Sequence, residues 1–458
     1  MQRAGSQYMV QLSSATLREI IDRRFSGYQC LVIGLCFLVA LFDGFDTQAV
    51  AFTGPAIIDA FQANVSQLAP VMTAGIVGMT VGAMVLGMSG DRLGRRNTLL
   101  LCVGIFAVAT LLTAFARHLD QLFILRVIAG FGMGGATPVL LALAAEYSPH
   151  KYRGLVTTGV LLALPAGAMS GGLLAAWVLP LWGWQSIYLI GGICPLVLLV
   201  VMLFVLPDSP EYLSTRPGGR NQARLIKILR NIAPQQPIPA GGALVESKPA
   251  REQGRLADLF SPALKLTTCG VWSVYFFNWV AWFMLLSWLP TLLKQSGLNP
   301  GDAPLASVTV NAAFILFALP LSWFLPRMNI LTILGCMFAT GILVALGLSY
   351  AVPGQQWWAV FTLIALAGFG IGGQQLALNY MVVATYPARI RATAMGWAIG
   401  TGRLGAIVGS AMGGIILSQF GAAGFFTLLV VPLLLSCLGV LLIRKRYRQG
   451  EGQTVTAH

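Results

Sequence analysis

Asp43-Gly44-Phe45-Asp46-Thr47 places two carboxylates inside the first long apolar run of the chain. A charge in the core of a lipid bilayer costs several kcal/mol unless it has a partner or a function. Positions three residues apart share one face of a helix, so both carboxylates point to the same side. The stretch therefore predicts a membrane protein that moves a proton or another ion.

The composition is typical of a polytopic membrane protein. Of the 458 residues, 57% are hydrophobic and 10% are charged, whereas soluble globular chains carry about 25% charged residues. Arg18, Arg23 and Arg24 precede the first apolar run, which has no small-residue cleavage site. We therefore expect no secretory signal peptide.

The net charge of +14 is unevenly distributed. Arg126 and Arg403 lie inside apolar runs, and only Arg117 and Lys294 fall on one alternating set of predicted loops. The remaining Lys and Arg lie on the other loops and the tails, which is the positive-inside pattern and predicts cytoplasmic termini. This bias explains the charge without nucleic acid, which we do not expect as a partner, and favours contact with anionic lipid.

Cysteine and histidine usage argues against metal chemistry. The seven cysteines lie in apolar runs without a C-x-x-C pair, as expected for small buried apolar side chains. His118 and His150 lie in predicted loops and His458 is the last residue, so carboxylates must carry any proton coupling. We expect no metal, no cofactor and no enzymatic activity.

Twelve apolar runs are each close to the ~20 residues that cross a bilayer. Lipid-facing backbone must satisfy its own hydrogen bonds, so these runs predict helices, and the short alternating segments of a barrel are absent. The expected fold class is an all-α polytopic membrane protein with twelve transmembrane helices in two six-helix halves. The runs are 28–55, 68–90, 97–116, 121–145, 154–180, 184–206, 264–291, 303–325, 330–351, 357–384, 392–418 and 423–443.

The longest polar segment separates six runs from six. It is rich in Arg, Pro and Gly, and it contains one short amphipathic helix near 223–232. The expected organisation is a cytoplasmic tail at 1–27, an N-terminal six-helix half at 28–206, a cytoplasmic linker at 207–263, a C-terminal six-helix half at 264–443 and a cytoplasmic tail at 444–458.

An internal repeat supports the two halves. Ala129–Gly135 reads AGFGMGG and recurs as AGFGIGG at Ala367–Gly373, and the same offset relates Arg153 to Arg391. The glycines predict close helix packing in both copies. A shared offset at separate places indicates duplication.

The two copies differ in charge. Arg126 corresponds to an isoleucine and Glu146 to an alanine, and the last six runs contain Arg403 but no acid. Packing would be shared by both copies, so it does not explain this asymmetry. We therefore expect the two halves to have different charged groups at the site, with acids from the first half and an arginine from the second.

Three motifs resemble the major facilitator superfamily. Gly87-Met88-Ser89-Gly90-Asp91-Arg92-Leu93-Gly94-Arg95-Arg96 resembles its G-x-x-x-D-R-x-G-R-R signature, and it follows the second of twelve helices as in the family. Arg126 with the following glycine run resembles the fourth-helix motif, and Leu206–Pro210 resembles the P-E-S-P element after the sixth helix. The resemblance covers essentially the whole chain.

Within that superfamily, Asp43–Thr47, Thr401–Gly405 and Ser287–Pro290 resemble the aromatic acid:proton symporters. Those proteins import benzoate-type and hydroxybenzoate-type acids in bacteria, which implies the inner membrane. Two departures are noted. The second-half loop at Leu325–Met328 lacks the acid usual there, so that gate is weaker or held differently, and the fifth run lacks the Gly-Pro dipeptide of antiporters, which argues against efflux.

Proton coupling is expected at Asp43, Asp46 and Arg126. A rise of ~1.5 Å per residue puts Asp43 and Arg126 at nearly the same depth. Arg126 is therefore expected to neutralise Asp43, Asp46 or both. Burial raises the pKa of a carboxyl group and a nearby cation lowers it, so an acid subject to both effects can gain and lose a proton. The alternative is a static ion pair that only fixes helix packing. Which aspartate titrates stays open.

Arg403 is the expected anchor for the substrate carboxylate, because its guanidinium stays charged and its fork fits a carboxylate. The alternative is a partner of Asp43, Asp46 or Glu146 across the interface of the halves. The two roles of Arg403 are compatible, because a substrate that competes with the acid for Arg403 would couple substrate transport to proton transport.

The seventh run supplies an aromatic wall around Asn278 that could stack a flat ring, although packing also explains its side chains. Candidate ring contacts there are Trp279 and Trp282. Gln374, Gln375 and Asn379 are candidate hydrogen-bond partners of ring hydroxyls, and interhelical hydrogen bonding is their alternative role.

Charged residues near the cytoplasmic helix ends are expected to form gates. A role as topology-setting charge is the alternative for the arginines. The gating residues expected are Asp91, Arg92, Arg95, Arg96, Glu146, Arg153 and Arg391, with Glu146 as a latch near Arg153.

Together these patterns predict secondary active import of a small aromatic carboxylate by proton symport with alternating access, carried out by a monomer. The alternatives are proton symport of a non-aromatic organic anion and, further off, drug/proton efflux.

Overall fold

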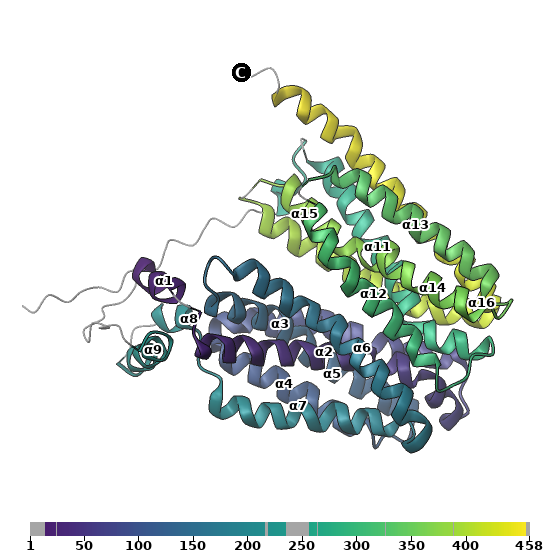
Figure 1. Cartoon of the computed structure of the whole chain (residues 1–458), viewed down its shortest axis with the longest axis horizontal. Helices are drawn as coiled ribbons and strands as arrows, with labels where there is room; N and C mark the ends of the chain where they lie inside the picture. The colour runs from purple at the N-terminus through teal and green to yellow at the C-terminus, as the bar shows by residue number, and fades with distance from the viewer. Residues whose placement is uncertain are drawn as a thin grey trace, which may run out of the picture.

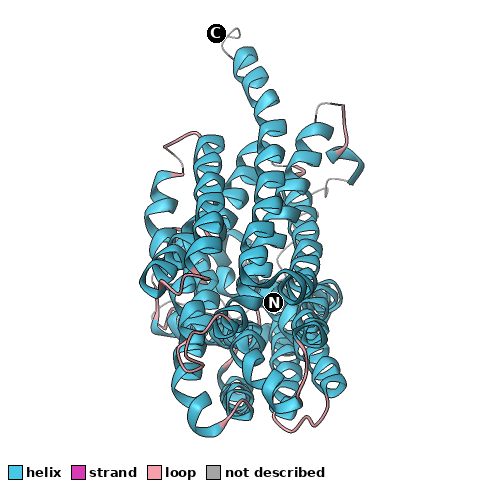
Figure 2. Ribbon diagram, turned by 90° about the vertical axis from the view of Figure 1, so that its right-hand side faces the viewer, coloured by secondary structure: helices cyan, strands magenta, loops and turns pink. Residues whose placement is uncertain are grey.

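The computed structural model describes residues 14–23, 25–215, 219–234, 256–262, 264–325, 327–387 and 389–454. Over these ranges the chain is helical and has no strand (Figures 1 and 2). The long helices lie side by side in two groups, α2–α7 and α11–α16 (Figure 1). We call these groups the first and the second bundle.

The first bundle consists of α2 Gly27–Phe61, α3 Val65–Leu93, α4 Arg95–Thr113, α5 Leu119–Tyr147, α6 Arg153–Trp182 and α7 Gln185–Val205. The second consists of α11 Lys265–Gln295, α12 Ala303–Phe324, α13 Ile330–Ala351, α14 Trp357–Ala367, the π-helix η1 Gly368–Gly372, α15 Gln374–Thr385 and α16 Arg391–Thr454. Four short helices accompany them: α1 Ser14–Arg23, α8 Pro210–Ser214, α9 Gly219–Ile232 and α10 Leu256–Leu259.

Ten stretches of the described chain are long and apolar enough to cross a membrane. The apolar helix α12 adds an eleventh, and α16 is two helices that meet at Gly421, whose φ of 64° and ψ of −167° are not helical. With that division, the described residues hold twelve apolar segments, of which α12 has a shorter apolar stretch than the others. The chain is an all-α, multi-pass membrane protein.

The bundle has two distinguishable ends. α1, α8 and α9 lie together at one end (left in Figure 1), which we call the linker end, and the opposite end is the far end. Successive long helices alternate in direction, so α2 begins at the linker end and α7 returns to it. Helix α9 covers the amphipathic helix expected near 223–232.

Small residues set the closest helix contacts. A Cβ on Gly44 of α2 would lie 1.9 Å from the carbonyl oxygen of Leu164 in α6. A Cβ on Gly130 of α5 would lie 2.1 Å from the carbonyl oxygen of Gly75 in α3. Small residues thus let α2 pack closely against α6, and α5 against α3.

The two copies of the glycine repeat differ in backbone. Ala129–Gly135 lies within the continuous helix α5, whereas Gly368–Gly372 forms the π-helix η1. The amide of Gln374 donates to the carbonyl of Gly370 at this turn. A π-turn holds one extra residue, and such turns are common at functional sites. The repeated sequence therefore produces two different local structures.

The apolar core is divided between the two ends. One cluster of buried side chains joins the far-end part of the first bundle, such as Phe52 and Ile57, to the second bundle through Trp288 and Leu292. A separate cluster fills the linker-end part of the first bundle with α1 and α9, and includes Val32, Leu99, Leu143 and others. The two bundles therefore share a core at the far end.

Polar contacts also join the bundles at the far end. Lys294 at the end of α11 forms a 2.5 Å salt bridge with Asp59 at the end of α2, and it donates to the carbonyl of Pro55 at 3.3 Å. A Cβ on Gly414 of α16 would lie 2.8 Å from the Cβ of Ala69 in α3. We call the Asp59–Lys294 pair the far-end bridge.

Gly44→Ala is expected to destabilise the protein, because the new methyl group meets backbone atoms that can move only if α2 and α6 separate. Gly34→Ala in the same helix is the matched control, since nothing lies within 4 Å of its added Cβ. Thermal unfolding in detergent should show a clear loss for Gly44→Ala and little change for Gly34→Ala. Equal melting temperatures would contradict the close contact.

Candidate functional site

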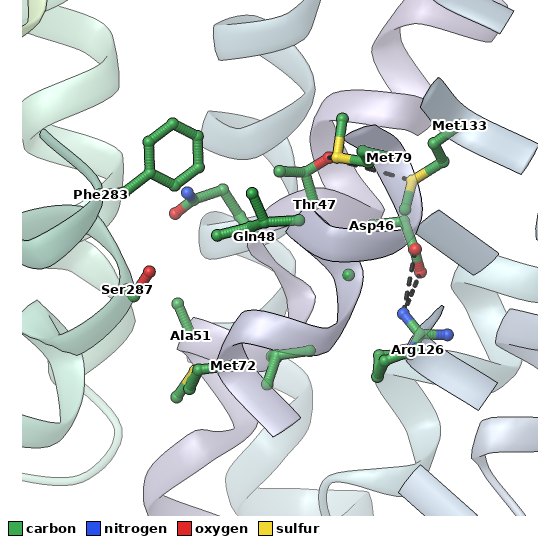
Figure 3. A pocket seen from close by; sticks show the side chains of 13 residues that line it. Asp46, Thr47, Gln48, Ala51, Met72, Met79, Arg126, Met133, Phe283 and Ser287 are labelled. Atoms are coloured by element: carbon green, nitrogen blue, oxygen red, sulfur yellow. Dashed lines mark hydrogen bonds and ion pairs between the residues drawn. The ribbon is translucent and has the colours of Figure 1, made fainter. Parts of the chain in front are cut away.

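Arg126 and Asp46 form a buried ion pair between α5 and α2. Nη1 of Arg126 donates to both carboxylate oxygens of Asp46 at 3.0 Å, and each residue is almost fully buried. Figure 3 shows the pair beside the central pocket. A buried guanidinium and carboxylate require close pairing to offset their lost hydration.

Neighbouring helices complete the surroundings of the pair. Thr110 of α4 donates to Asp46 at 2.8 Å. Nη2 of Arg126 donates to the hydroxyls of Thr110 and Thr113 at 3.1 and 2.8 Å, and the guanidinium lies 5.0 Å from the ring centre of Tyr188. Four helices of the first bundle therefore converge on one guanidinium.

Asp43 has a different environment. Its side chain is 0% exposed and accepts hydrogen bonds from Thr137 at 2.9 Å and from Thr47 at 3.4 Å. In the described part of the chain no Lys or Arg forms a salt bridge with Asp43. Hydroxyl donors can serve either the ionised or the protonated carboxyl group, because a hydroxyl can also accept a hydrogen bond.

The two acids of the opening motif are thus distinguished by geometry. The sequence left open whether Arg126 neutralises Asp43, Asp46 or both, and the structure pairs it with Asp46. Arg403 is near enough to interact electrostatically with Asp43, but it does not form an ion pair with it. Asp46 is paired with Arg126, whereas Asp43 has no salt bridge to a described residue.

The side chain of Arg403 extends from the second bundle to the first. It lies on α16, and its Nη1 donates to the backbone carbonyl of Met79 in α3 at 2.6 Å. This contact lies midway along α3, whereas the far-end bridge lies at the helix ends. The sequence offered an acid as an alternative partner for Arg403, but the partner observed is a neutral carbonyl.

The predicted ring-binding residues form a hydrogen-bonded chain within the second bundle. Trp279 donates to Gln375 at 2.5 Å, Gln375 donates to Asn379 at 3.1 Å, and the hydroxyl of Tyr275 also donates to Asn379 at 2.8 Å. The Trp279 ring stacks on Phe283 with their centres 5.6 Å apart. The hydrogen bonds of Trp279 and Tyr275 join α11 to α15, and the one between Gln375 and Asn379 lies within α15.

Trp279 also lies against the helix of Arg403. A Cβ on Gly402 would lie 3.1 Å from the Trp279 ring. Trp282 instead contacts η1, since a Cβ on Gly372 would lie 2.7 Å from its ring. The two tryptophans therefore face different neighbours, and Trp279 is the one beside Arg403.

Among the residues that the structure describes, three buried side-chain amide oxygens have no hydrogen-bond partner. They belong to Gln48 of α2, Asn278 of α11 and Gln374 of α15. A buried acceptor without a donor costs about 1–3 kcal/mol. Each is thus a position at which a ligand hydroxyl or a water would gain a hydrogen bond.

A central pocket lies between the bundles (Figure 3). The cavity itself is small in this conformation, about 30 Å³. Its walls are Asp46, Thr47, Gln48, Val50 and Ala51 of α2, Met72, Gly75, Ile76 and Met79 of α3, Arg126 and Met133 of α5, and Phe283 and Ser287 of α11.

The pocket contains only some of the predicted site residues. Asp46 and Arg126 line it, whereas Asp43, Arg403 and the second-bundle amides Asn278, Gln374, Gln375 and Asn379 do not. Arg403 lies at the edge of the pocket, where it binds the carbonyl of the wall residue Met79. Trp279 also lies at the edge, where it stacks on the wall residue Phe283. The predicted coupling residues Asp46 and Arg126 therefore line the pocket, and the predicted anchor Arg403 lies at its edge beside Met79.

Several polar residues of the site were not identified from the sequence. Gln48 follows Asp46 by two positions, and Thr110 and Thr113 lie three apart in an apolar run. Thr137 precedes the proline inside α5. Polar side chains spaced on one face of an apolar run were the signal that could have identified them.

The expected gate residues hold the linker end of the first bundle together. Glu146 forms its salt bridge with Arg95 and accepts a hydrogen bond from Ser209. The partner of the expected latch residue Glu146 is thus Arg95 at the start of α4, while Arg153 lies nearby and binds the carbonyl of Ala145. Arg96 donates to the carbonyls of Leu203 and Leu206 at 2.6 Å each.

The related arginines of the repeat both bind backbone. Arg153 donates to the carbonyl of Ala145 at 3.1 Å, and Arg391 donates to that of Tyr386 at 3.3 Å. Each braces the turn that precedes its own helix. Arg92 is exposed near the end of α3, and the side chain of Asp91 lies outside the part that the structure describes.

Across the described ranges, no three His, Cys, Asp or Glu side chains lie close enough together to hold a metal ion.

Comparison with known proteins identifies the family. The sequence profile of the Major Facilitator Superfamily matches residues 36–351 and 271–457. The chain belongs to the Major Facilitator Superfamily. It is a transporter and not an enzyme.

Characterised relatives share most of the chain. It is 35% identical to a gallate transporter of Pseudomonas putida, over 93% of this chain and 94% of that protein. It is 34% identical to the 4-hydroxybenzoate transporter PcaK of the same species, over 92% and 94%. A crystal structure of a D-xylose-proton symporter matches with a TM-score of 0.70 at 17% identity, over 91% and 97% of the two chains, which supports the shared fold.

Asp46→Asn is expected to destabilise the protein by about 3–5 kcal/mol, because it leaves the buried guanidinium of Arg126 without its counter-charge. Asp43→Asn is the matched control three residues away, since an amide can still accept from Thr137. Thermal unfolding of the two variants in detergent should separate them clearly. A larger loss for Asp43→Asn would contradict the assignment of the ion pair.

Proposed function

We propose that the protein imports a hydroxylated aromatic carboxylate together with protons, by alternating access. The observation that carries the proposal is the charge arrangement where the bundles meet. Asp43 of the first bundle is a buried carboxyl group without a salt bridge among the described residues, and Arg403 of the second bundle reaches the carbonyl of Met79 in the first. The names of the relatives, gallate and 4-hydroxybenzoate transporters, supply the substrate class.

Asp43 is the proposed proton carrier. Asp46 is neutralised by Arg126, so its ionised form is stabilised throughout the cycle. Asp43 has only hydroxyl partners, so its charged form is poorly compensated and protonation relieves the cost of burial. Of the two alternatives from the sequence, the static pair suits Asp46 and the proton site suits Asp43.

Arg403 is the proposed anchor of the substrate carboxylate. Its present partner is the neutral carbonyl of Met79. A carboxylate would replace that contact with a charge-assisted, bidentate one, which is roughly twice as strong per hydrogen bond. Substrate binding would then also remove the electrostatic influence of Arg403 on Asp43, which links anion binding to the protonation of that acid.

The aromatic ring is proposed to lie against Trp279 and Phe283, with its hydroxyls toward the unpaired amide oxygens. Flat rings stack favourably on such side chains. Gln48, Asn278 and Gln374 offer acceptors that need donors, and a phenolic hydroxyl is a donor. These acceptors favour hydroxylated acids over unsubstituted benzoate.

The alternating-access cycle is proposed to move the halves 28–206 and 264–443 against each other. The shared core and the far-end bridge support a conformation that is closed at the far end. The basic loops support a cytoplasmic linker end with cytoplasmic termini, and thus an inner-membrane protein. One chain contains both sides of the site, so we propose that a monomer is sufficient.

The driving force depends on the number of protons. One pH unit supplies about 1.4 kcal/mol per proton, and 100 mV adds ~2.3 kcal/mol per net charge carried. One proton with a monoanion is electrically neutral and gains only the pH contribution. With Asp46 held by Arg126, the site offers one free carboxyl group, which favours one proton per cycle.

Asp43→Asn is expected to abolish uptake of labelled 4-hydroxybenzoate or gallate driven by a pH gradient in vesicles. Exchange of internal for external substrate should persist, because it needs no net proton movement. Asp120→Asn, an exposed acid at the start of α5, is the control and should retain both activities. Unimpaired accumulation by Asp43→Asn would remove Asp43 as the proton carrier.

Arg403→Lys is expected to weaken apparent substrate affinity in the exchange assay roughly 10- to 100-fold, the range for losing hydrogen bonds to a charged group. Lysine keeps the charge but loses the bidentate fork. Arg389→Lys at the linker end is the control, since Arg389 pairs with Asp258 far from the pocket. An unchanged affinity in Arg403→Lys would refute the anchor.

The same vesicles distinguish the alternative substrates. Strong uptake of an aliphatic acid without competition by hydroxybenzoates would favour a transporter of non-aromatic organic anions. Export of cationic drugs with no aromatic-acid uptake would favour efflux.

A further inference from the structure

A second pocket lies at the linker end, apart from the central site. It is formed where α4 begins, α7 ends and α9 lies across them. The space between its walls, open side included, is about 740 Å³. The residues that matter here are Arg96, Phe204, Asp208, Arg224, Lys227 and Asn231.

The pocket has an excess of positive charge. Arg96, Arg224 and Lys227 line it together with one carboxylate, Asp208, which lies 3.6 Å from Arg224. Arg96 is fixed by its hydrogen bonds to the carbonyls at the end of α7. One acid cannot neutralise three cations, so the pocket has a net charge of about +2 and suits an anionic group.

Helix α9 holds its two cations in place. Arg224 and Lys227 are one turn apart on α9 and therefore share a face. The opposite face, including Leu225, Leu229 and Ile232, is buried in the linker-end core of the first bundle. The helix is thus docked on the bundle, and its basic face is held beside the pocket.

An exposed apolar stripe leads from the pocket along α7. Phe204 in the pocket wall is 86% exposed, and Val200, Val197 and Ile193 continue the stripe at intervals of three or four residues. Exposed apolar side chains on a membrane-spanning helix face lipid chains. The basic pocket therefore lies where the lipid-facing side of α7 meets the membrane surface.

We propose that this pocket binds the phosphate of an anionic phospholipid such as phosphatidylglycerol. Arg224 and Lys227 hold the phosphate, Asn231 supplies a polar side chain at the rim, and an acyl chain lies along the stripe of α7. Free inorganic phosphate shares the same chemistry, but it would make no use of the stripe. The bound lipid bridges α9 and α7, and so ties the linker to the first bundle.

The test is lipid binding to the full-length protein in detergent, followed by native mass spectrometry and thermal unfolding. Phosphatidylglycerol, phosphatidylcholine and inorganic phosphate are compared. The double variant Arg224→Gln/Lys227→Gln is expected to bind phosphatidylglycerol at least tenfold more weakly. Arg220→Gln/Arg230→Gln is the matched control, since it removes the same charge from α9 outside the pocket and should retain binding.

Three outcomes would overturn the proposal. Equal weakening in both double variants would indicate general surface attraction. Equal stabilisation by inorganic phosphate would indicate a free-phosphate site, and equal binding of phosphatidylcholine would remove the role of net charge. Melting temperatures without added lipid show whether each variant is folded, and a variant that has lost its fold is replaced by Lys227→Gln alone, with Arg230→Gln as its control.

Discussion

The buried ion pair of Asp46 and Arg126 is the constraint on which the rest of the site depends. A guanidinium cannot release its charge in the bilayer, so the first bundle must hold a carboxylate against it in every conformation. Hydroxyls from α4 and the ring of Tyr188 complete that arrangement. With one acid paired in this way, its neighbour Asp43 on the same helix has hydroxyl partners instead of a salt bridge in the described part of the chain.

Much of the fold was predictable because lipid imposes simple rules. Long apolar runs gave the helices, and the motifs at Gly87–Arg96 and Arg126 indicated the family. Contacts that depend on side-chain direction were not predictable from spacing. Depth alone could not separate Asp43 from Asp46 as the partner of Arg126, and Glu146 lay nearer in sequence to Arg153 than to Arg95. The repeat predicted equal helices at Ala129–Gly135 and Ala367–Gly373, but the second copy contains a π-turn.

The division of the core separates the packing within the first bundle from the contacts between the bundles. At the far end, apolar contacts and one exposed salt bridge join the bundles, and exposed salt bridges contribute little stability each. Toward the linker end, the first bundle has its own core with α1 and α9. In the proposed cycle, the first bundle would keep this core while its contacts with the second bundle change.

The hydrogen bond from Arg403 to a backbone carbonyl has a consequence for leakage. In the proposed cycle, a carrier with a proton on Asp43 and no substrate would keep the positive charge of Arg403 uncompensated near the middle of the membrane, which would make its reorientation slow. A bound carboxylate would cancel that charge and lower the barrier. A protonated carrier that reorients slowly without substrate leaks few protons, so the neutral resting partner of one arginine would limit proton leak.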